Sequence, residues 1–405
     1  MSGMVHPEGS PARHMKGYRA STSQPLNIDE LRERARRYLP RGFFEYIDRG
    51  AEDEEALARN RQALRQIGFV PRTLVDTSGR DTSITLFGER LAAPLIVAPT
   101  AAAGLIWHQG ETALARAAKA AGIPFSLSTA SIQPLEDVAS AAGGQLWFQL
   151  YAYPDLSLSY ELVDRAKAAG YGALIVTVDT TVGPNREYNH RNAFRVPLIP
   201  SARLAADAVL HPRWSLGVVL RHLLSAGLPE FVNLPSALRT DLRGQGRGAN
   251  LMPKNEAITW QVIAQLRKRW DGPLIVKGLL HEADALAAVD TGVDGIVVSN
   301  HGGRNLDAVV SPIEVLPGIA DAARGRIAIL MDSGIRRGAD IAKALALGAD
   351  AVLVGRAALW GVASGGEPGA RLALQILQTE LSRIMAQLGV NSVAQLRQAS
   401  YRRLT

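Results

Sequence analysis

The sequence predicts a (β/α)8 barrel, an α/β fold in which eight parallel strands close into a cylinder surrounded by helices. Eight short apolar runs recur along the chain, each run is continuous rather than alternating in polarity, and helix-like amphipathic segments separate them. Continuous apolar runs are typical of strands that are buried on both faces of a parallel sheet. Eight strand–helix units in series favour a closed barrel, and a doubly wound open sheet is the structural alternative. The 405 residues, 47% of them hydrophobic, are enough to bury such a core.

The chain before the barrel is predicted to be helical. Residues 1–25 are rich in Ser, Pro, Gly and basic residues, and we expect them to form a mobile arm. The stretch N-I-D-E-L-R-E-R-A-R-R-Y-L-P then begins with the capping residue Asn27 and acidic first-turn residues, and Pro40 ends it. The helical pattern resumes and continues to about Asn60.

The barrel domain is assigned to residues 26–390 and a C-terminal tail to residues 391–405. Its eight predicted strands are residues 94–99, 123–128, 146–151, 173–179, 273–278, 295–300, 327–332 and 351–356. The interval 180–272, after strand four, is too long for an ordinary connection, so we predict an insertion. Its middle, R-L-A-A-D-A-V-L-H-P-R-W-S-L-G-V-V-L-R-H-L-L-S, has two interpretations. It forms a pair of lid or oligomer helices, or it docks on a membrane with Trp214 and the arginines at headgroup level.

Composition narrows the function classes. The net charge of +7 suits anionic ligands or an anionic membrane surface, but without a basic block interleaved with aromatics no nucleic-acid partner is predicted. The absence of cysteine excludes disulfides, thiolate metal sites and cysteine nucleophiles. The few histidines lack ligand spacing, so no metal site is predicted. The N-terminus does not resemble a secretory signal, and no stretch approaches the roughly 20 apolar residues of a spanning helix. We expect a cytoplasmic protein, or one peripheral on the inner face of the cell membrane.

Polar residues stand where the apolar runs end. The C-terminal ends of barrel strands form the active face, so these side chains are expected to share one site. A buried polar group without a partner costs on the order of 1–3 kcal/mol, which makes a common ligand the economical explanation. In chain order the strand-end residues are Pro99, Thr100, Ala101, Ser128, Gln149, Tyr151, Thr177, Asp179, Lys277, Ser299, His301, Arg304, Asp332, Gly334, Gly355 and Arg356.

The last two strand ends indicate a phosphate site. D-S-G-I-R-R-G-A-D and G-R-A place Gly and Arg where backbone N–H groups and a helix N-terminus reach an anion. No G-x-G-x-x-G follows a strand and no P-loop is present, which disfavours a nicotinamide cofactor. Flavin mononucleotide (FMN) and pyridoxal phosphate both remain open, because Lys277 stands where a Schiff-base lysine could lie.

The segment S-N-H-G-G-R-N-L-D after strand six carries the predicted chemistry. His301 is a candidate base, and the planar fork of Arg304 suits a carboxylate. A base beside a carboxylate clamp is what removal of a proton from a 2-hydroxy acid requires. Asp179, at the end of strand four, is placed to orient the imidazole of His301.

These segments resemble the FMN-dependent α-hydroxy-acid oxidases and dehydrogenases. The resemblance extends from about Asn27 to about Leu388 and includes F-F-E-Y-I-D-R-G-A-E-D-E, A-P-T-A, W-F-Q-L-Y and L-I-V-T-V-D. L-H-P-R-W-S-L and L-S-T-A-S are most similar to the (S)-mandelate dehydrogenase branch. The resemblance implies oxidation of an (S)-2-hydroxy acid to the 2-oxo acid by a homotetramer, with a quinone-type acceptor or oxygen taking the electrons from FMN.

The resemblance also implies a role for each site residue. His301 would be the base and Asp179 its partner. Substrate would be bound by Tyr46, Tyr151, Arg186 and Arg304. The flavin ring would be surrounded by Pro99, Thr100, Ala101, Ser128, Gln149, Thr177, Lys277 and Ser299. The ribityl and phosphate groups would be held by Asp332, Gly334, Arg336, Gly355 and Arg356.

Three positions depart from the common family pattern. Asn305 replaces a frequent Gln, which alters how the loop of His301 is held. Ala130 replaces a bulky Trp of short-chain oxidases and leaves room for an aryl group, so mandelate-like substrates are favoured over lactate or glycolate. Ala101 matches the oxidases, whereas the mandelate dehydrogenase branch carries Gly, so the acceptor stays open between oxygen and a quinone. The alternatives are a lactate dehydrogenase or oxidase of the same family, a Schiff-base lyase that uses Lys277, and a non-catalytic FMN-binding protein.

Overall fold

The computed structural model describes residues 24–192, 194, 202–225, 227, 231–235 and 255–404. Eight parallel strands close into a barrel in the order β10-β11-β4-β5-β6-β7-β8-β9, which confirms the predicted fold and all eight predicted strands. The strands are β4 Leu95–Val97, β5 Phe125–Ser128, β6 Leu146–Leu150, β7 Ala173–Thr177, β8 Leu274–Leu279, β9 Gly295–Val298, β10 Ala328–Met331 and β11 Ala351–Val354.

Both faces of the barrel strands are buried, which explains why the apolar runs are continuous. One face fills the barrel with a cluster that includes Ile96, Ile175 and Ile275. The residues next to them belong to a second cluster that the surrounding helices cover. The hairpin of β2 (Ile84–Leu86) and β3 (Glu89–Leu91) adds Leu86 and Leu91 to the interior cluster. Because nearly all of these side chains are removed from water, the strands show no polar alternation.

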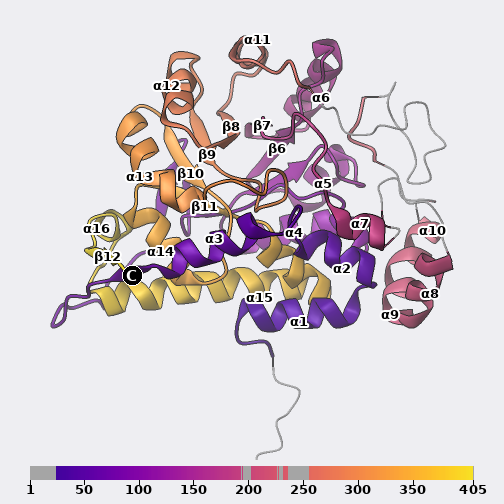
Figure 1. Cartoon of the computed structure of the whole chain (residues 1–405), viewed down its shortest axis with the longest axis horizontal. Helices are drawn as coiled ribbons and strands as arrows, with labels where there is room; N and C mark the ends of the chain where they lie inside the picture. The colour runs from indigo at the N-terminus through magenta and orange to yellow at the C-terminus, as the bar shows by residue number, and fades with distance from the viewer. Residues whose placement is uncertain are drawn as a thin grey trace, which may run out of the picture.

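Helices surround the barrel in the expected alternation (Figure 1). At the start of α13 (Pro312–Ala323), the backbone N–H of Ser311 donates to the side-chain carboxylate of Glu314 at 2.6 Å. The long helix α15 runs beside the N-terminal helix α1 and bends at Gly365 and Gly366. The bounds are η1 Ala103–Leu105, α4 Gly110–Ala120, α5 Leu135–Ala142, α6 Leu156–Ala168, α11 Trp260–Arg269, α12 Glu282–Asp290, α13 Pro312–Ala323, α14 Gly338–Ala346 and α15 Arg356–Leu388.

Three helices precede the barrel: α1 Ile28–Tyr38, α2 Arg41–Asp48 and α3 Glu55–Arg65. The side chain of Asn27 accepts a hydrogen bond from the backbone N–H of Glu30 at 2.9 Å, so Asn27 is the predicted N-cap. Pro40 separates α1 from α2, as expected. The predicted mobile arm lies outside the described residues, except for Gln24 and Pro25.

The C-terminal segment folds back onto the N-terminal part of the chain. Strand β12 (Tyr401–Arg403) pairs antiparallel with β1 (Ile67–Phe69), and the short helix α16 (Val393–Leu396) precedes it. Residues 391–404 are therefore a packed element of the barrel domain, whereas the sequence suggested only a tail.

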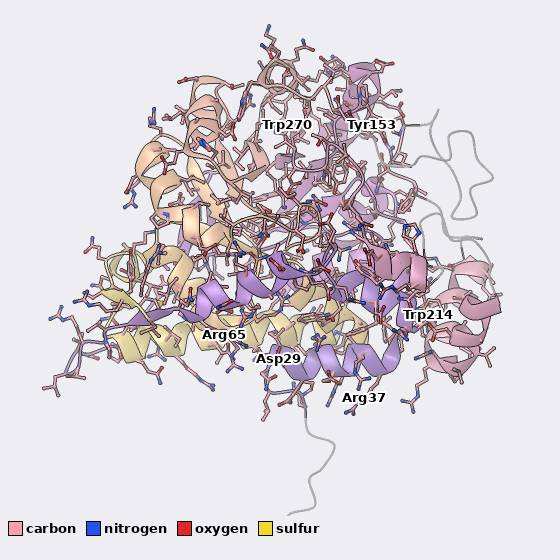
Figure 2. All side chains as sticks on the ribbon, in the orientation of Figure 1. Asp29, Arg37, Arg65, Tyr153, Trp214 and Trp270 are labelled. Carbon is pink, nitrogen blue, oxygen red and sulfur yellow. The ribbon has the colours of Figure 1, made fainter. Side chains whose placement is uncertain are left out.

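The predicted insertion carries short helices at one side of the barrel (Figure 1): α7 Glu187–Arg191, α8 Ala202–Leu210, α9 Pro212–Trp214, the π-helix η2 Ser215–Leu220 and α10 Arg221–Ser225. The interval 180–272 also contains α11, the helix that leads into β8. One of the two interpretations of the insertion placed Trp214 at headgroup level, and the structure does not place the ring there. Trp214, labelled in Figure 2, has a side chain that is 3% exposed, and its indole N–H donates to the carbonyl oxygen of Leu105 at 2.9 Å. No helix within the described part of the chain is long and apolar enough to cross a membrane.

Candidate active site

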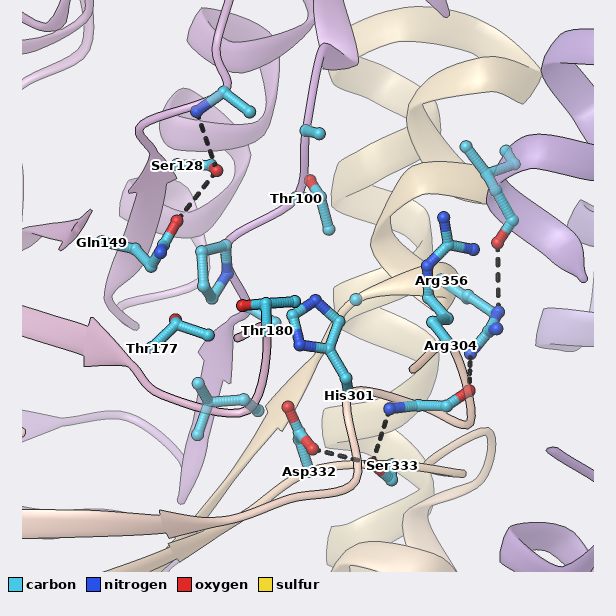
Figure 3. A pocket seen from close by; sticks show the side chains of 18 of the residues that line it. Thr100, Ser128, Gln149, Thr177, Thr180, His301, Arg304, Asp332, Ser333 and Arg356 are labelled. Carbon is cyan, nitrogen blue, oxygen red and sulfur yellow. Dashed lines mark hydrogen bonds between the residues drawn. The ribbon is translucent and has the colours of Figure 1, made fainter. Parts of the chain in front are cut away.

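A cavity of about 400 Å³ opens at the C-terminal ends of the barrel strands. It gathers side chains that are far apart in the sequence, with His301 between Gln149 on one side and Arg356 on the other (Figure 3). Seventeen of the predicted site residues line it: Tyr46, Pro99, Thr100, Ala101, Ser128, Gln149, Tyr151, Thr177, Arg186, Lys277, His301, Arg304, Asp332, Gly334, Arg336, Gly355 and Arg356. The other two predicted residues, Asp179 and Ser299, lie behind the lining and contact it by hydrogen bonds.

His301 is held in one orientation by its neighbours. Its Nδ1 lies 2.8 Å from Oδ1 of Asp179, and its backbone N–H donates to Oγ of Ser299 at 3.0 Å. The amide of Asn305 donates to the carbonyl oxygen of Asp179 at 2.9 Å, so this departure from the family pattern fixes the partner of His301. Because Nδ1 is engaged, Nε2 is the ring nitrogen left to exchange a proton with a ligand in the cavity.

The environment keeps the imidazole of His301 neutral. Burial lowers the pKa of His301, the charges of Lys277 and Arg186 act in the same direction, and Asp179 opposes them. Burial raises the pKa of Asp179, but the interaction with His301 and the charge of Lys277 together outweigh burial, so the net direction is downward. A neutral imidazole beside a carboxylate is a competent base near neutral pH.

Lys277 takes part in a buried ion pair rather than standing free. Its Nζ lies 3.0 Å from Oδ2 of Asp332 and donates to Oγ of Ser299 at 2.8 Å. Burial lowers the pKa of Lys277, but the carboxylates of Asp332 and Asp179 outweigh burial and raise it overall. A lysine held protonated is a poor nucleophile, so this geometry disfavours the Schiff-base alternative.

Two guanidinium groups meet at the mouth of the cavity. The guanidinium carbon of Arg304 lies 5.1 Å from the ring centroid of Tyr46, and that of Arg186 lies 6.0 Å from the same ring. Burial and the charge of Arg304 lower the pKa of Arg186. A carboxylate bound between the two arginines would offset the repulsion of their charges and accept hydrogen bonds from both guanidinium groups. Burial also raises the pKa of Tyr151, which keeps its hydroxyl protonated as a donor.

Arg356, which the sequence placed among the groups that hold the ribityl and phosphate, lines the cavity, and its guanidinium hydrogen-bonds to backbone carbonyl oxygens. Its guanidinium donates to backbone carbonyl oxygens at the C-terminal end of α2, namely those of Ile47, Asp48 and Arg49, at 3.0–3.1 Å. It also donates to the carbonyl oxygen of Gly302 at 2.8 Å. The side chain therefore joins α2 to the loop of His301, while its own backbone starts α15 beside the cavity.

The loops after β10 and β11 form an anion cradle. Gly334 has a φ of +91°, and a Cβ atom there would lie 2.9 Å from the carbonyl oxygen of Asn60, so only glycine fits. Helix α15 begins after Gly355 without a side-chain cap, which leaves its first N–H groups free to bind an anion. Burial and the charge of Arg61 lower the pKa of Arg336 to about 10, so this buried guanidinium stays charged at neutral pH.

The opposite wall presents a buried amide. Oγ of Ser128 donates to Oε1 of Gln149 at 2.9 Å, which orients the amide (Figure 3). Nε2 of Gln149 is buried and has no hydrogen-bond partner among the described residues. An unpaired buried donor that lines a cavity indicates a ligand acceptor at this place.

Some residues that build the site were not predicted from the sequence. Asn60 on α3 and Asn300 exchange two amide hydrogen bonds at 2.8 and 3.0 Å in the buried interior. Asp307 accepts from the N-terminal N–H groups of α3, and Ser333 Oγ accepts from Gly302 and donates to Asp332. Asn300 and Asp307 flank His301 in the quoted motif, which was the available signal, but their partners lie about 240–250 residues away.

Comparison with known proteins gives a consistent set of relatives. The FMN-dependent dehydrogenase family matches residues 35–403. (S)-mandelate dehydrogenase of Pseudomonas putida is 41% identical over 373 residues, which cover 92% of this chain and 92% of the relative. L-lactate dehydrogenase of Alcaligenes faecalis is 40% identical over 369 residues, which cover 91% of this chain and 96% of the relative.

Solved structures are similar over nearly the same length. The crystal structure of a monotopic membrane protein, (S)-mandelate dehydrogenase, has a TM-score of 0.88 and 40% identity and covers 94% of this chain and 100% of that chain. Mandelate oxidase with (S)-2-phenylpropionate has a TM-score of 0.79 and 35% identity over the same shares.

Proposed function

This chain belongs to the FMN-dependent dehydrogenase family, and on that premise we propose that it oxidises an (S)-2-hydroxy acid with an aryl side chain to the 2-oxo acid. One observation carries the assignment of roles: the hydrogen-bonded pair of His301 and Asp179 faces the same cavity as the guanidinium groups of Arg186 and Arg304. A base and a carboxylate clamp on one cavity are the two elements that a 2-hydroxy acid needs.

The residues of the cavity fit FMN. The unpaired Nε2 of Gln149 and the charged Nζ of Lys277 are donors for the polar edge of a flavin. Gly334, Gly355 and Arg336 form the anion cradle for the phosphate. Pro99, Thr100, Ala101, Ser128 and Thr177 complete the wall of the ring site, with Ser299 holding Lys277 from behind. When bound, FMN accepts the two electrons that leave the α-carbon of the substrate.

The chain's own groups bind and deprotonate the substrate. Arg186 and Arg304 bind its carboxylate, and the hydroxyls of Tyr46 and Tyr151 donate hydrogen bonds to it. Nε2 of His301 takes one proton, whether from the hydroxyl or from the α-carbon, and Asp179 stabilises the imidazolium that results.

The small side chain of Ala130 favours an aryl substrate. Ala130 lines the cavity and is 3% exposed, so the space beyond its methyl group belongs to the ligand site. L-lactate is the second candidate, because L-lactate dehydrogenases match this chain about as closely as (S)-mandelate dehydrogenase does. A substrate with a phenyl ring fills the space at Ala130, whereas a methyl group does not.

The short helices of the insertion support a membrane-bound acceptor. Leu210, Leu216 and Leu224 are 76%, 62% and 80% exposed, while Trp214 and His222 face inward and are buried. An exposed apolar face of this kind suits the interfacial region of a bilayer, and one structural relative is described as a monotopic membrane protein. We infer that this face docks on a membrane and that a quinone-type molecule there takes the electrons.

One experiment tests the main proposal. The purified protein should show a yellow flavin spectrum, and (S)-mandelate added without oxygen should bleach it faster than L-lactate or glycolate. H301Q should retain FMN and lose bleaching. A colourless protein, or a flavin that none of the three acids reduces, would contradict the proposal. Borohydride added with substrate tests the lyase alternative, because only a Schiff base at Lys277 would be trapped.

A further inference from the structure

Residues 231–235 of the insertion contribute a side chain to the lining of the cavity. Phe231 is 3% exposed and lines the cavity together with Ala130. Asn233 and Leu234 are fully buried. Residues 231–235 form neither helix nor strand, so helix or sheet hydrogen bonds do not hold their backbone. Another contact must therefore fix the position of Phe231.

Asn233 provides that fixation. Its Oδ1 accepts from the backbone N–H of Leu135 at 2.9 Å, and its Nδ2 donates to the backbone carbonyl oxygen of Gln133 at 2.7 Å. The side-chain amide thus satisfies a donor and an acceptor two residues apart on one loop, as a neighbouring strand would. Both bonds are buried or part-buried, so water competes poorly for them.

The loop to which Asn233 is hydrogen-bonded begins at Ala130. It is held in place by further hydrogen bonds. Oγ of Ser131 donates to the carbonyl oxygen of Gln133 at 3.0 Å, and the side chain of Gln133 accepts from the backbone N–H of Thr112 at 3.0 Å. The backbone N–H of Ala130 donates to Oγ of Ser128 at 3.1 Å. Asn233, two residues after Phe231, is therefore hydrogen-bonded to the loop that begins at Ala130, and both Phe231 and Ala130 line the cavity.

We propose that Phe231 is a specificity-determining residue that contacts the aryl group of the substrate, and that Asn233 is the residue that positions it. The inference rests on the proposed function and deepens it by naming the apolar wall of the substrate site. The arginines and His301 bind the reacting end of a 2-hydroxy acid, so selection between side chains falls to apolar groups such as Phe231. An aromatic ring prefers another ring as neighbour, in an offset or edge-to-face arrangement.

The test compares kcat/KM for (S)-mandelate with kcat/KM for L-lactate. F231A should lower the mandelate-to-lactate ratio on the order of tenfold to hundredfold, the range typical of a lost apolar contact in a specificity pocket. F231L keeps apolar volume without the ring and should give an intermediate ratio. Binding of phenylacetate, measured against acetate by the change in flavin absorbance, should weaken in parallel. An unchanged ratio in both variants, or an equal loss for both substrates, would overturn the assignment of Phe231.

N233A tests whether Asn233 positions Phe231. It should lower the mandelate-to-lactate ratio of kcat/KM. The double variant F231A/N233A should lower that ratio no further than F231A alone, because Asn233 acts through Phe231. Additive effects would overturn that coupling. W214F is the matched control: Trp214 is buried in the insertion but does not line the cavity, so the mandelate-to-lactate ratio of W214F should equal that of the wild type.

A wild-type flavin that no 2-hydroxy acid reduces contradicts the proposed function, whereas a mandelate preference that survives F231A contradicts only this inference.

Discussion

Arg356 donates a hydrogen bond from Nη1 to the backbone carbonyl oxygen of Gly302 at 2.8 Å, and so joins the first residue of α15 to the neighbour of His301. The other nitrogens of the same guanidinium donate to the last carbonyl oxygens of α2, the helix that carries Tyr46. Those carbonyls form the negative end of the helix dipole, which favours a cation there. One buried side chain thereby connects the loop of His301 to the helix that carries Tyr46.

Replacing Arg356 by Lys should weaken both stability and catalysis. A lysine keeps the charge but cannot reach four carbonyl oxygens with a planar fork, and each buried acceptor left unpaired costs roughly 1–3 kcal/mol. We expect a lower melting temperature and a fall in kcat/KM with (S)-mandelate, while the affinity for FMN changes little. Thermal unfolding and FMN titration measure the two effects. A large rise in the Kd for FMN with unchanged stability would instead support a phosphate contact by the Arg356 side chain.

The activity should depend on pH through His301. Because burial lowers the pKa of His301 below the ordinary value of 6.5, the neutral base persists at and above pH 6.5. The value of kcat/KM should therefore be flat there and fall tenfold per pH unit once the pH drops below that lowered pKa.

D179N tests the effect of the Asp179 carboxylate on the pKa of His301. The carboxylate of Asp179 raises the pKa of His301 against the effect of burial, so its removal should move the acid limb to lower pH while lowering the plateau. A pH-rate profile of D179N and wild type measures both changes. A limb that moves to higher pH would show that Asp179 does not stabilise the imidazolium.

The ion pair of Lys277 and Asp332 should behave as a coupled unit. The two side chains are 5% and 10% exposed, so K277M leaves Asp332 buried without its cation. Loss of one partner of a buried pair costs about 3–5 kcal/mol because it leaves the other charge unpaired, whereas removal of both charges avoids that cost. We expect the double variant K277M/D332N to unfold at a higher denaturant concentration than K277M alone. Additive destabilisation by K277M and D332N would indicate that the two charges do not stabilise each other.

The fold and the location of the site were predictable because they depend on local patterns. Continuous apolar runs identify buried parallel strands, and the position of a residue near the C-terminal end of a strand, such as Lys277 in β8, places it at the active face of a barrel. His301 and Asp179 come from different strands, yet the barrel topology alone was enough to predict that they meet. Structure confirms that contact at 2.8 Å.

Side-chain direction was not predictable in the same way. Arg356 follows a strand, and its guanidinium hydrogen-bonds to the carbonyl of Gly302 and to carbonyls of α2 more than 300 residues away, which no periodicity encodes. Trp214 lies between arginines in an amphipathic segment. Its ring is nevertheless buried, and its indole N–H donates a hydrogen bond to the carbonyl oxygen of Leu105. Phe231 stands in a segment with neither helical nor strand periodicity, so nothing marked it before the structure placed it on the cavity.

The exposed leucines of the insertion should bind the protein to membranes. Leu216, Leu220 and Leu224 are 62%, 43% and 80% exposed on η2 and α10. Full burial of one leucine contributes roughly 1.5–3 kcal/mol, so even partial insertion of three should hold the protein on a bilayer. Replacing all three by Ser should reduce co-sedimentation with anionic phospholipid vesicles at least tenfold, while bleaching by (S)-mandelate in solution is retained.

The matched control is the double variant V70S/L74S. Val70 and Leu74 are also exposed, but they lie outside the insertion, in the connection that follows β1. If membrane binding depends on general surface hydrophobicity, co-sedimentation of this control with vesicles should fall as much as that of the triple variant. If it depends on the insertion, the control should co-sediment like the wild type, and reduction of a vesicle-borne quinone should fall only in the triple variant. Equal behaviour of the triple variant and the wild type in both assays would contradict membrane docking by this face.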